Sequence, residues 1–136
     1  MTPDLGEFLR DVAARRRKPG EWDCCTFPAT WALACGWPDP MVAWRGAYDC
    51  EETAHAFIAG AGGLEFLFAK GMAAAGVPEV VGSDFEPGDI GVMQMIGEQA
   101  GAVYTGRRWA FVVARGMGFT PVEPEHIVKA WLVAHG

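Results

Sequence analysis

Trp22-Asp23-Cys24-Cys25-Thr26-Phe27 opens an apolar segment that ends at Gly36. Aspartate is a favoured residue at a helix start, and glycine is a common residue just past a helix end. Pro28 is tolerated only in a first turn, so the regular helix is expected to begin a residue or two after Cys24. The sequence therefore predicts a helix over about 23–36 that has two cysteines at its start.

A first helix is predicted before this one. Thr2 is expected to cap it, with Pro3 at its first position, and Pro19-Gly20 stops it. The basic run Arg15-Arg16-Arg17-Lys18 is expected to be a solvated helix end, with a docking surface for an acidic partner as the alternative. The buried face follows the i, i+3, i+4 spacing and comprises Leu5, Phe8, Leu9, Val12 and Ala13.

Two further helices are predicted after an ordered loop over 37–48. Asp49-x-x-Glu52 approximates a capping box for a helix over 50–59. The glycines between 60 and 63 break that helix, and a fourth one is predicted over 64–75.

The composition changes after Gly76 to short apolar segments bounded by glycine, proline or charge, which is typical of strands and hairpins. The residues 127–133 fit either a strand or a short helix. Helices first and antiparallel strands second predict an α+β fold in a single domain over 1–136, with a helical part of about 2–76 and a sheet part of about 77–136. The predicted strands are 77–81, 89–95, 100–105, 109–114 and 119–122.

Composition and charge exclude several classes of function. The chain has 136 residues, half of them apolar, which is enough for a single buried core. Its net charge of −6 argues against nucleic acid as the main partner. No apolar stretch approaches the ~20 residues of a membrane span. The polar start, Met1-Thr2-Pro3-Asp4, does not resemble an export signal, so a soluble protein made in the cytoplasm is expected.

Aromatic side chains and glycines have mainly structural roles in this prediction. Arg45 can either pair with a buried carboxylate or anchor a partner, and the sequence leaves both open. Turns with positive φ or a close backbone approach are expected at Gly46, Gly63 and Gly88. The core between helices and sheet is expected to contain Trp22, Trp31, Trp44, Tyr48 and Trp131.

Cys24 is the candidate nucleophile, because a thiol in the first turn of a helix gains from the helix dipole and from unpaired N–H groups. Those N–H groups can also bind an oxyanion. The charge of Asp23 partly opposes thiolate formation. The structural alternative is that Cys24 and Cys25 are small buried residues at a helix start.

Four cysteines are present, at Cys24, Cys25, Cys35 and Cys50, and none forms a Cys-x-x-Cys pair. Four reduced thiols without a cofactor are therefore expected. A metal or iron–sulfur module that uses all four is the alternative.

The Asp23–Phe27 stretch resembles the Asp-Cys-Ser-Gly-Phe motif of the NlpC class of papain-like cell-wall peptidases. Pro87-Gly88-Asp89-Ile90 matches the motif that opens a strand in that class. The resemblance implies a papain-like NlpC-type fold, in which N-terminal helices pack on a C-terminal antiparallel sheet. It also implies that Cys24 holds the nucleophile position.

The same resemblance implies that the catalytic histidine of the NlpC class is absent from this chain. The class shows His-x-Gly-Ile-Tyr on the next strand, where this chain has Ala100-Gly101-Ala102-Val103-Tyr104. Ala100, or Gln99 after a one-residue shift, takes the histidine position, and neither accepts a proton from a thiol. The following strand, 108–112, offers no obvious polar residue to orient a base.

Another histidine would have to serve as the base. His55 is expected in the third helix, His126 before the last element, and His135 in the tail. Loss of a triad member costs about 10⁴-fold in turnover. The sequence therefore favours a non-catalytic protein with a vestigial Cys24.

A second resemblance covers nearly the whole chain. Trp44-Arg45-Gly46-Ala47-Tyr48, the turn Gly62-Gly63-Leu64, Trp109-Ala110-Phe111 and Lys129-Ala130-Trp131 follow the cysteine motif in order. This pattern is similar to that of a family of small proteins encoded in the tail modules of siphophages and prophages. In gene order these proteins take the place of an NlpC-type tail peptidase, beside the tail-tip hub proteins.

The implied role is that of a minor tail or tail-tip assembly protein, a pseudoenzyme with a degenerate peptidase-like fold. Its implied partners are hub and distal tail proteins, with peptidoglycan as a further contact. The implied location is the host cytoplasm during assembly and then the tail tip of the virion. The alternative is an active cysteine peptidase that cleaves peptidoglycan stem peptides during phage entry.

Overall fold

The computed structural model describes residues 3–134, in which four α-helices precede a five-stranded sheet. The predicted α+β class and the order of helices before strands are confirmed. The helices are α1 (Leu5–Val12), α2 (Thr26–Ala34), α3 (Glu51–Gly60) and α4 (Leu64–Ala75). The strands are β1 (Ile90–Met95), β2 (Glu98–Tyr104), β3 (Trp109–Val113), β4 (Gly116–Thr120) and β5 (Ile127–Trp131), with a 3₁₀ turn, η1 (Pro124–His126), before β5.

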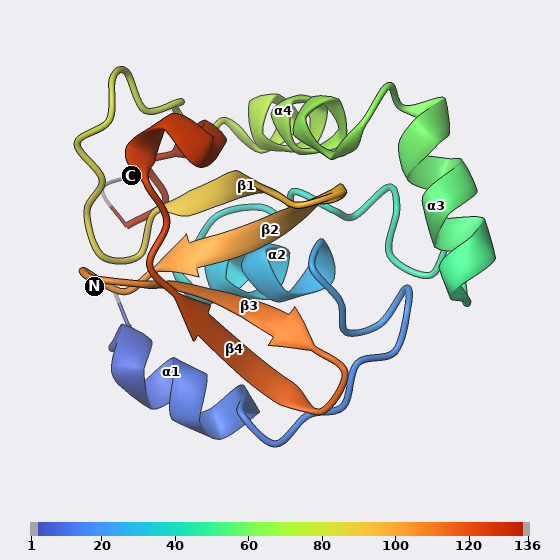
Figure 1. Ribbon diagram of the computed structural model, residues 1–136, viewed down its shortest axis with the longest axis horizontal. Helices are drawn as coiled ribbons and strands as arrows, with labels where there is room; N and C mark the ends of the chain where they lie inside the picture. Colours follow the sequence, from blue (N-terminus) through green and yellow to red (C-terminus); the bar gives the residue numbers. More distant parts are fainter. Residues whose placement is uncertain (1–2, 135–136) are drawn as a thin grey trace.

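The strands pair antiparallel in the order β4-β3-β2-β1-β5. Figure 1 shows α2 behind the sheet, α4 along the side of β1 and α3 at the end of the β1–β2 hairpin. Both α2 and α4 contact β2, and α4 also contacts β1 and β5. Among residues 3–134, no α-helix lies in front of the opposite sheet face in this view. The sheet therefore has one helix-covered face and one face without a helix.

The core lies between the helices and the covered sheet face. Trp31 is 1% exposed, and its indole nitrogen donates a hydrogen bond of 2.8 Å to the Gly88 carbonyl, which ties α2 to the turn before β1. Trp22, Tyr48 and Trp131 are also buried, as predicted, whereas Trp44 is only partly buried. Other core side chains come from both halves of the chain and include Phe27, Phe68, Met72, Ile90, Val92 and Val103.

Arg45 pairs with a carboxylate, and three glycines adopt positive φ, as the sequence analysis allowed. The Arg45 guanidinium pairs at 2.5 Å with the partly buried carboxylate of Asp39. Gly46, Gly63 and Gly88 have φ of 75°, 123° and 96°, a region that favours glycine. The loop over 37–48 is therefore held by an ion pair as well as by packing.

Two predicted helix caps are wrong. Asp4 caps α1, because its side chain accepts the Glu7 N–H, and Thr2 lies outside the described residues. The cap of α3 is Cys50, which forms a capping box with Thr53 in place of Asp49 and Glu52. Aspartate, threonine and cysteine side chains all reach backbone N–H groups, so neighbouring polar residues compete for a cap.

The basic run is not a solvated helix end, because α1 ends at Val12 and the run lies in the connection to α2. Arg15 stacks on the Trp22 ring, with its guanidinium carbon 3.9 Å from the ring centre. Arg17 forms an ion pair with Glu51 at the start of α3. The basic run therefore connects the segment before α2 to the start of α3.

The predicted strand 77–81 is also wrong. Glu79 forms only an isolated bridge with Trp131, although Val80 N–H donates to the Ala130 carbonyl at 2.8 Å. Pro78 has no N–H to donate, which prevents a regular ladder at this point. The undecided segment 127–133 contains a strand, β5.

Among residues 3–134, no single helix has the length and apolar composition of a membrane span. The pair α3 and α4 passes that test when joined, but the two helices meet at 71°. Gly62 and Gly63 have positive φ at this break.

The closest approach of helix start and sheet is at Gly101 in β2. A Cβ atom built there would lie 2.1 Å from the Cys24 carbonyl oxygen and 2.5 Å from the Phe68 ring. Only a glycine therefore fits between α2, α4 and β2 without displacement of backbone.

We expect Gly101→Ala to destabilise the fold by about 1–3 kcal/mol, because the added methyl group overpacks a contact with backbone. Gly60→Ala is the matched control, since a Cβ there meets nothing within 4 Å. Urea unfolding followed by tryptophan fluorescence measures both. Equal unfolding midpoints for the two variants would contradict the close packing of Cys24 on β2.

Candidate functional site

Cys24 lies just before α2 and against β2. Its backbone closely approaches Gly101 of β2, and Cys24 is partly exposed. Its side chain also packs against a buried cluster on the opposite sheet face, formed by Met93, Ala100, Ala102 and Trp109. The structure thus brings the start of the cysteine helix against β2, the strand that follows the one opened by Pro-Gly-Asp.

Asp23 holds the start of α2 in place. Its carboxylate is 3% exposed and accepts the N–H groups of Cys25 and Thr26, both at 2.9 Å. The same carboxylate accepts the Gly20 N–H and the Tyr48 hydroxyl, both at 2.8 Å. A buried carboxylate needs this many donors to offset its lost hydration. Asp23 therefore acts as a helix cap that also binds the two flanking loops.

The surroundings of the two adjacent thiols separate their pKa values. The Cys25 thiol donates a hydrogen bond to Cys24, and this lowers the pKa of Cys24 below that of an ordinary thiol. The Gly101 N–H and the charge of Arg17 lower that pKa further, against burial and the Asp23 charge. The pKa of Cys25 is raised well above its usual value, first because it is the donor to Cys24 and second because it is buried. Cys24 is therefore the thiolate-forming member of the pair.

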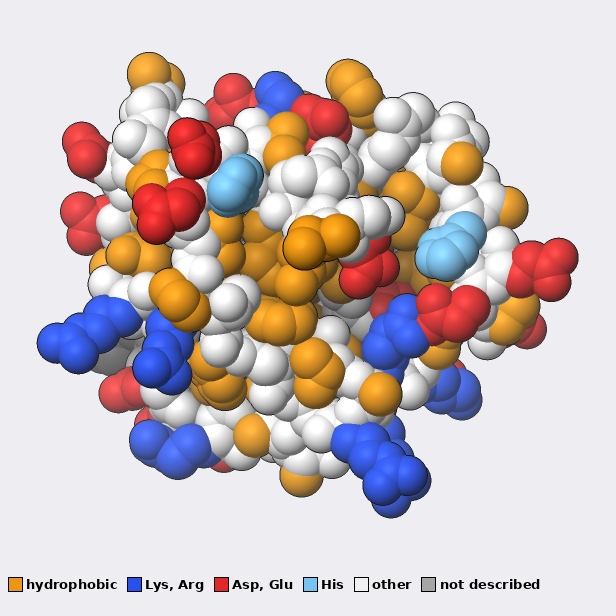
Figure 2. All heavy atoms as spheres, viewed as in Figure 1, with side chains coloured by type: hydrophobic (Ala, Val, Ile, Leu, Met, Phe, Trp, Pro, Cys, Tyr) orange, Lys and Arg blue, Asp and Glu red, His pale blue; other side chains and the backbone are white. Residues whose placement is uncertain are grey.

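A cavity of about 410 Å³ opens beside these thiols. One wall is α3, which contributes Glu51 and His55, and another is the end of the β1–β2 hairpin. Arg17 reaches Glu51 across the cavity wall, and the Arg17 hydrogen bond lowers the pKa of the Glu51 carboxyl group. Figure 2 shows basic, acidic and histidine side chains together over α3. The cavity thus combines a polarised thiol, an ion pair and an imidazole.

Ala100 aligns with the histidine of the NlpC-class motif. It is 7% exposed and pairs with Met93 of β1. Gln99 lines the thiol cavity, and its side-chain oxygen accepts the Glu65 N–H at 3.4 Å. An alkyl group and a carboxamide cannot serve as a base at neutral pH.

Of the three histidines, the structure brings His55 to the thiol cavity. His126 lies in η1 and lines a different groove. His135 lies outside the described residues. His55 on α3 is thus the histidine among residues 3–134 that lines this cavity.

The remaining thiols, Cys35 and Cys50, are not among the residues that line the thiol cavity. Cys35 caps the far end of α2, about 13 Å along a nine-residue helix, and burial raises its pKa to about 11. Cys50 caps α3 and is exposed, and the Thr53 hydroxyl lowers its pKa. Across residues 3–134, no group of three or more His, Cys, Asp or Glu side chains could hold a metal ion. The four thiols are not arranged as a metal site.

Sequence reasoning missed Arg17 and Glu51 as residues of this cavity, and it assigned Tyr48 to the core alone. Tyr48 is buried, as expected, but its hydroxyl also binds the Asp23 carboxylate, and burial raises its pKa. No local pattern marks these residues, because the Arg17–Glu51 pair joins segments far apart in the sequence.

The fold and the site define an α+β domain in which a polarised thiol at a helix start faces the second strand of an antiparallel sheet. Residues 1–133 match the family described as a domain of unknown function (DUF6950), and the chain belongs to this family. No curated protein and no solved structure matches the chain.

We expect Cys24 to react with iodoacetamide at a lower pH than an ordinary thiol, whose pKa is ~8.5, because the lowered pKa populates the thiolate earlier as pH rises. Cys35 should react only at higher pH, because its pKa is about 11. Rates measured across pH, with each label located by fragment mass spectrometry, test both expectations.

Two substitutions at Cys25 provide the control. Cys25→Ala removes the thiol that donates to Cys24, so the pH midpoint for Cys24 labelling should rise, whereas Cys25→Ser keeps a donor and should leave it near the wild-type value. Identical midpoints in both variants, or labelling of Cys24 only after denaturation, would contradict the polarised thiol.

Proposed function

We propose that this protein is a structural or assembly component of a siphophage tail tip, with a degenerate NlpC-type, papain-like fold that does not cleave peptide bonds. The observation that carries the proposal is Ala100, a buried methyl group on the strand against which Cys24 packs. The helix that begins after Cys24 and the antiparallel sheet that follows Pro87-Gly88-Asp89 support the likeness to the peptidase fold.

The surroundings of Ala100 support the absence of catalysis. Its neighbours in the same buried cluster are Met93, Ala102 and Trp109, and none of these side chains takes up a proton at neutral pH. A cysteine peptidase needs a base that takes the thiol proton and returns it to the leaving amine. At position 100 of β2 this chain has no group for either step.

The tail assignment rests on the likeness to tail-module proteins. A tail-tip component needs surfaces for other proteins more than it needs a catalytic base, and this α+β chain has alanine at position 100 of β2. In this role the protein assembles in the host cytoplasm with hub and distal tail proteins and then resides at the virion tail tip.

The second candidate is an active cysteine hydrolase that cleaves peptidoglycan stem peptides. The lowered pKa of Cys24 and the position of His55 in the same cavity favour it. In this reaction His55 takes the Cys24 thiol proton, the thiolate attacks an amide carbonyl, and the His55 imidazolium returns the proton to the leaving amine. Water then hydrolyses the thioester and regenerates the thiol.

In a phage that encodes this chain, we expect deletion of its gene to abolish infectious particles and to leave incomplete tails in electron micrographs. A Cys24→Ala copy should restore the wild-type titre, because the proposed role needs the fold and not the thiol. Intact tails after deletion would overturn the tail proposal. Failure of Cys24→Ala to complement, with normal folding of that variant, would favour the hydrolase.

Purified protein should not cleave muropeptides above the level of a Cys24→Ser variant. If the hydrolase candidate is correct, cleavage will be detected by mass spectrometry, and both Cys24→Ser and His55→Ala will lower its rate by ~10⁴-fold. His126→Ala is the matched control, because His126 lies outside the thiol cavity and should leave any cleavage unchanged.

A further inference from the structure

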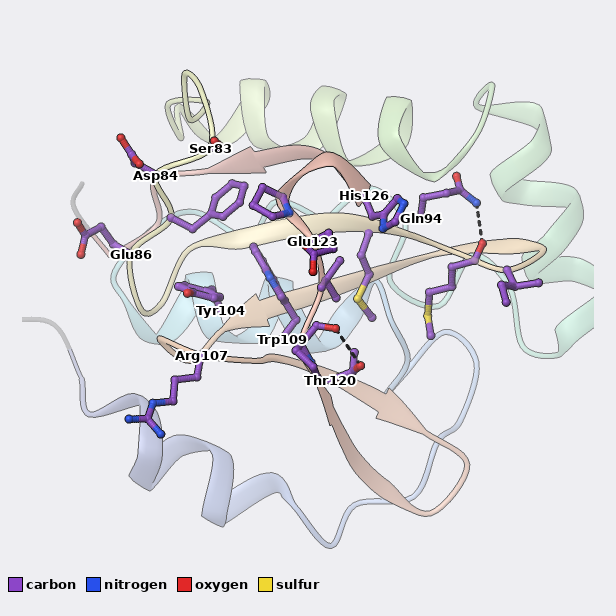
Figure 3. Close-up of a pocket in the computed structure, with 17 residues that line it drawn as sticks. Ser83, Asp84, Glu86, Gln94, Tyr104, Arg107, Trp109, Thr120, Glu123 and His126 are labelled. Carbon is purple, nitrogen blue, oxygen red and sulfur yellow. Dashed lines mark hydrogen bonds between the residues drawn. The ribbon is translucent and has the colours of Figure 1, made fainter.

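The sheet face without a helix contains a groove of about 1000 Å³, distinct from the thiol cavity. Figure 3 shows that its residues come from the loop before β1, from β1 to β3, and from the segment between β4 and β5. Figure 2 shows hydrophobic side chains gathered over the middle of this hollowed face. The groove is thus formed by several segments that the fold holds together.

Aromatic side chains form the floor of the groove. Phe85, Tyr104 and Trp109 contact one another, with ring centres 5.0 to 6.1 Å apart. Trp109 is 1% exposed and anchors the group in the sheet, while Phe85 and Tyr104 are partly exposed. Ile96, at the tip of the β1–β2 hairpin, is fully exposed and also lines the groove. This floor offers apolar contact area and π faces to a ligand.

Acidic side chains form the rim. The groove is lined by three exposed carboxylates, Asp84, Glu86 and Glu123. Its lining residues include one arginine, Arg107. His126 is the other residue there that can become positively charged. Figure 3 shows Asp84 and Glu86 at one end of the groove and Glu123 near Trp109. The rim is therefore negative at neutral pH.

We propose that this groove binds a protein segment that carries lysine or arginine side chains beside apolar ones. The apolar side chains would pack on the aromatic floor, and the cations would meet the acidic rim and the faces of Tyr104 and Phe85. Nucleic acid and acidic peptides are disfavoured, because the rim and the net charge of −6 repel them. This binding is independent of the tail role, since any basic and apolar segment would satisfy it.

The test uses two short, end-blocked peptides. One alternates lysine and leucine with glycine and serine, and the other has glutamate at each lysine position. Isothermal titration calorimetry at physiological salt should show saturable binding of the lysine peptide and no detectable binding of the glutamate peptide. Equal binding of both peptides would overturn the charge-based assignment.

Two triple variants with the same change in charge locate the binding. Asp84→Asn/Glu86→Gln/Glu123→Gln should weaken the lysine peptide about tenfold, which corresponds to ~1.4 kcal/mol. Glu7→Gln/Asp11→Asn/Glu52→Gln changes exposed carboxylates on α1 and α3 and should weaken it less than about twofold. Equal losses in both triple variants would show attraction by net charge alone and would overturn the proposal.

Ile96→Ser tests the apolar part of the groove without a change in charge or core packing, because Ile96 is fully exposed. We expect it to weaken binding of the lysine peptide severalfold.

The competing occupant of the groove is a second copy of this chain, and sedimentation velocity tests for it. A concentration-dependent dimer that Ile96→Ser dissociates would assign the groove to self-association and overturn the proposal. Loss of the tail role in the phage experiment would leave these binding results unchanged.

Discussion

The buried carboxylate of Asp23 is the interaction on which the helical half depends. It binds the N–H groups at the start of α2, the Gly20 N–H before that helix and the Tyr48 hydroxyl before α3. Burial of a single carboxylate costs several kcal/mol unless donors surround it. Because these donors come from three segments, the carboxylate fixes the start of α2 relative to both flanking loops. Cys24, the next residue, is thereby held in one position against β2.

The same carboxylate shapes the chemistry of the thiol beside it. Its charge opposes the Cys24 thiolate, and the hydrogen bond from Cys25, the Gly101 N–H and the charge of Arg17 together outweigh it. A base in this cavity would also need a group to orient it. Glu51 is the acidic residue of α3 that lines the cavity with His55, but its carboxylate is paired with Arg17. The cavity therefore stabilises a thiolate more fully than it equips an imidazole for proton transfer.

Local patterns predicted most of the fold. The bounds of the fourth helix, 64–75, are confirmed because Gly63 and Gly76 limit an apolar segment on both sides. The strand prediction failed at 77–81, where Pro78 interrupts the ladder that the apolar residues suggested. The caps failed because several polar residues close together can each bind a free N–H group.

The candidate site was predictable only in part. Cys24 and its position at a helix start follow from the Asp-Cys motif and the glycine that ends the helix. The Arg17–Glu51 pair and the His55 position depend on how α3 packs beside α2, and no local pattern encodes that packing. The groove was missed for the same reason, because Phe85, Tyr104 and Trp109 meet only in the folded sheet.

The alternation of β2 connects the missing base to the groove. Successive side chains of a strand point to opposite faces, so Gly101 and Val103 face the helices while Ala100 and Ala102 face the other cluster. A histidine at position 100 would place an imidazole among Met93 and Trp109, at a cost of about 1–3 kcal/mol unless it found a partner. Alanine there avoids that cost and lets the apolar cluster under the groove extend to Cys24. Ala100, on which the proposed lack of catalysis depends, thus also makes this face of the sheet more apolar, so both proposals depend on the same side chain.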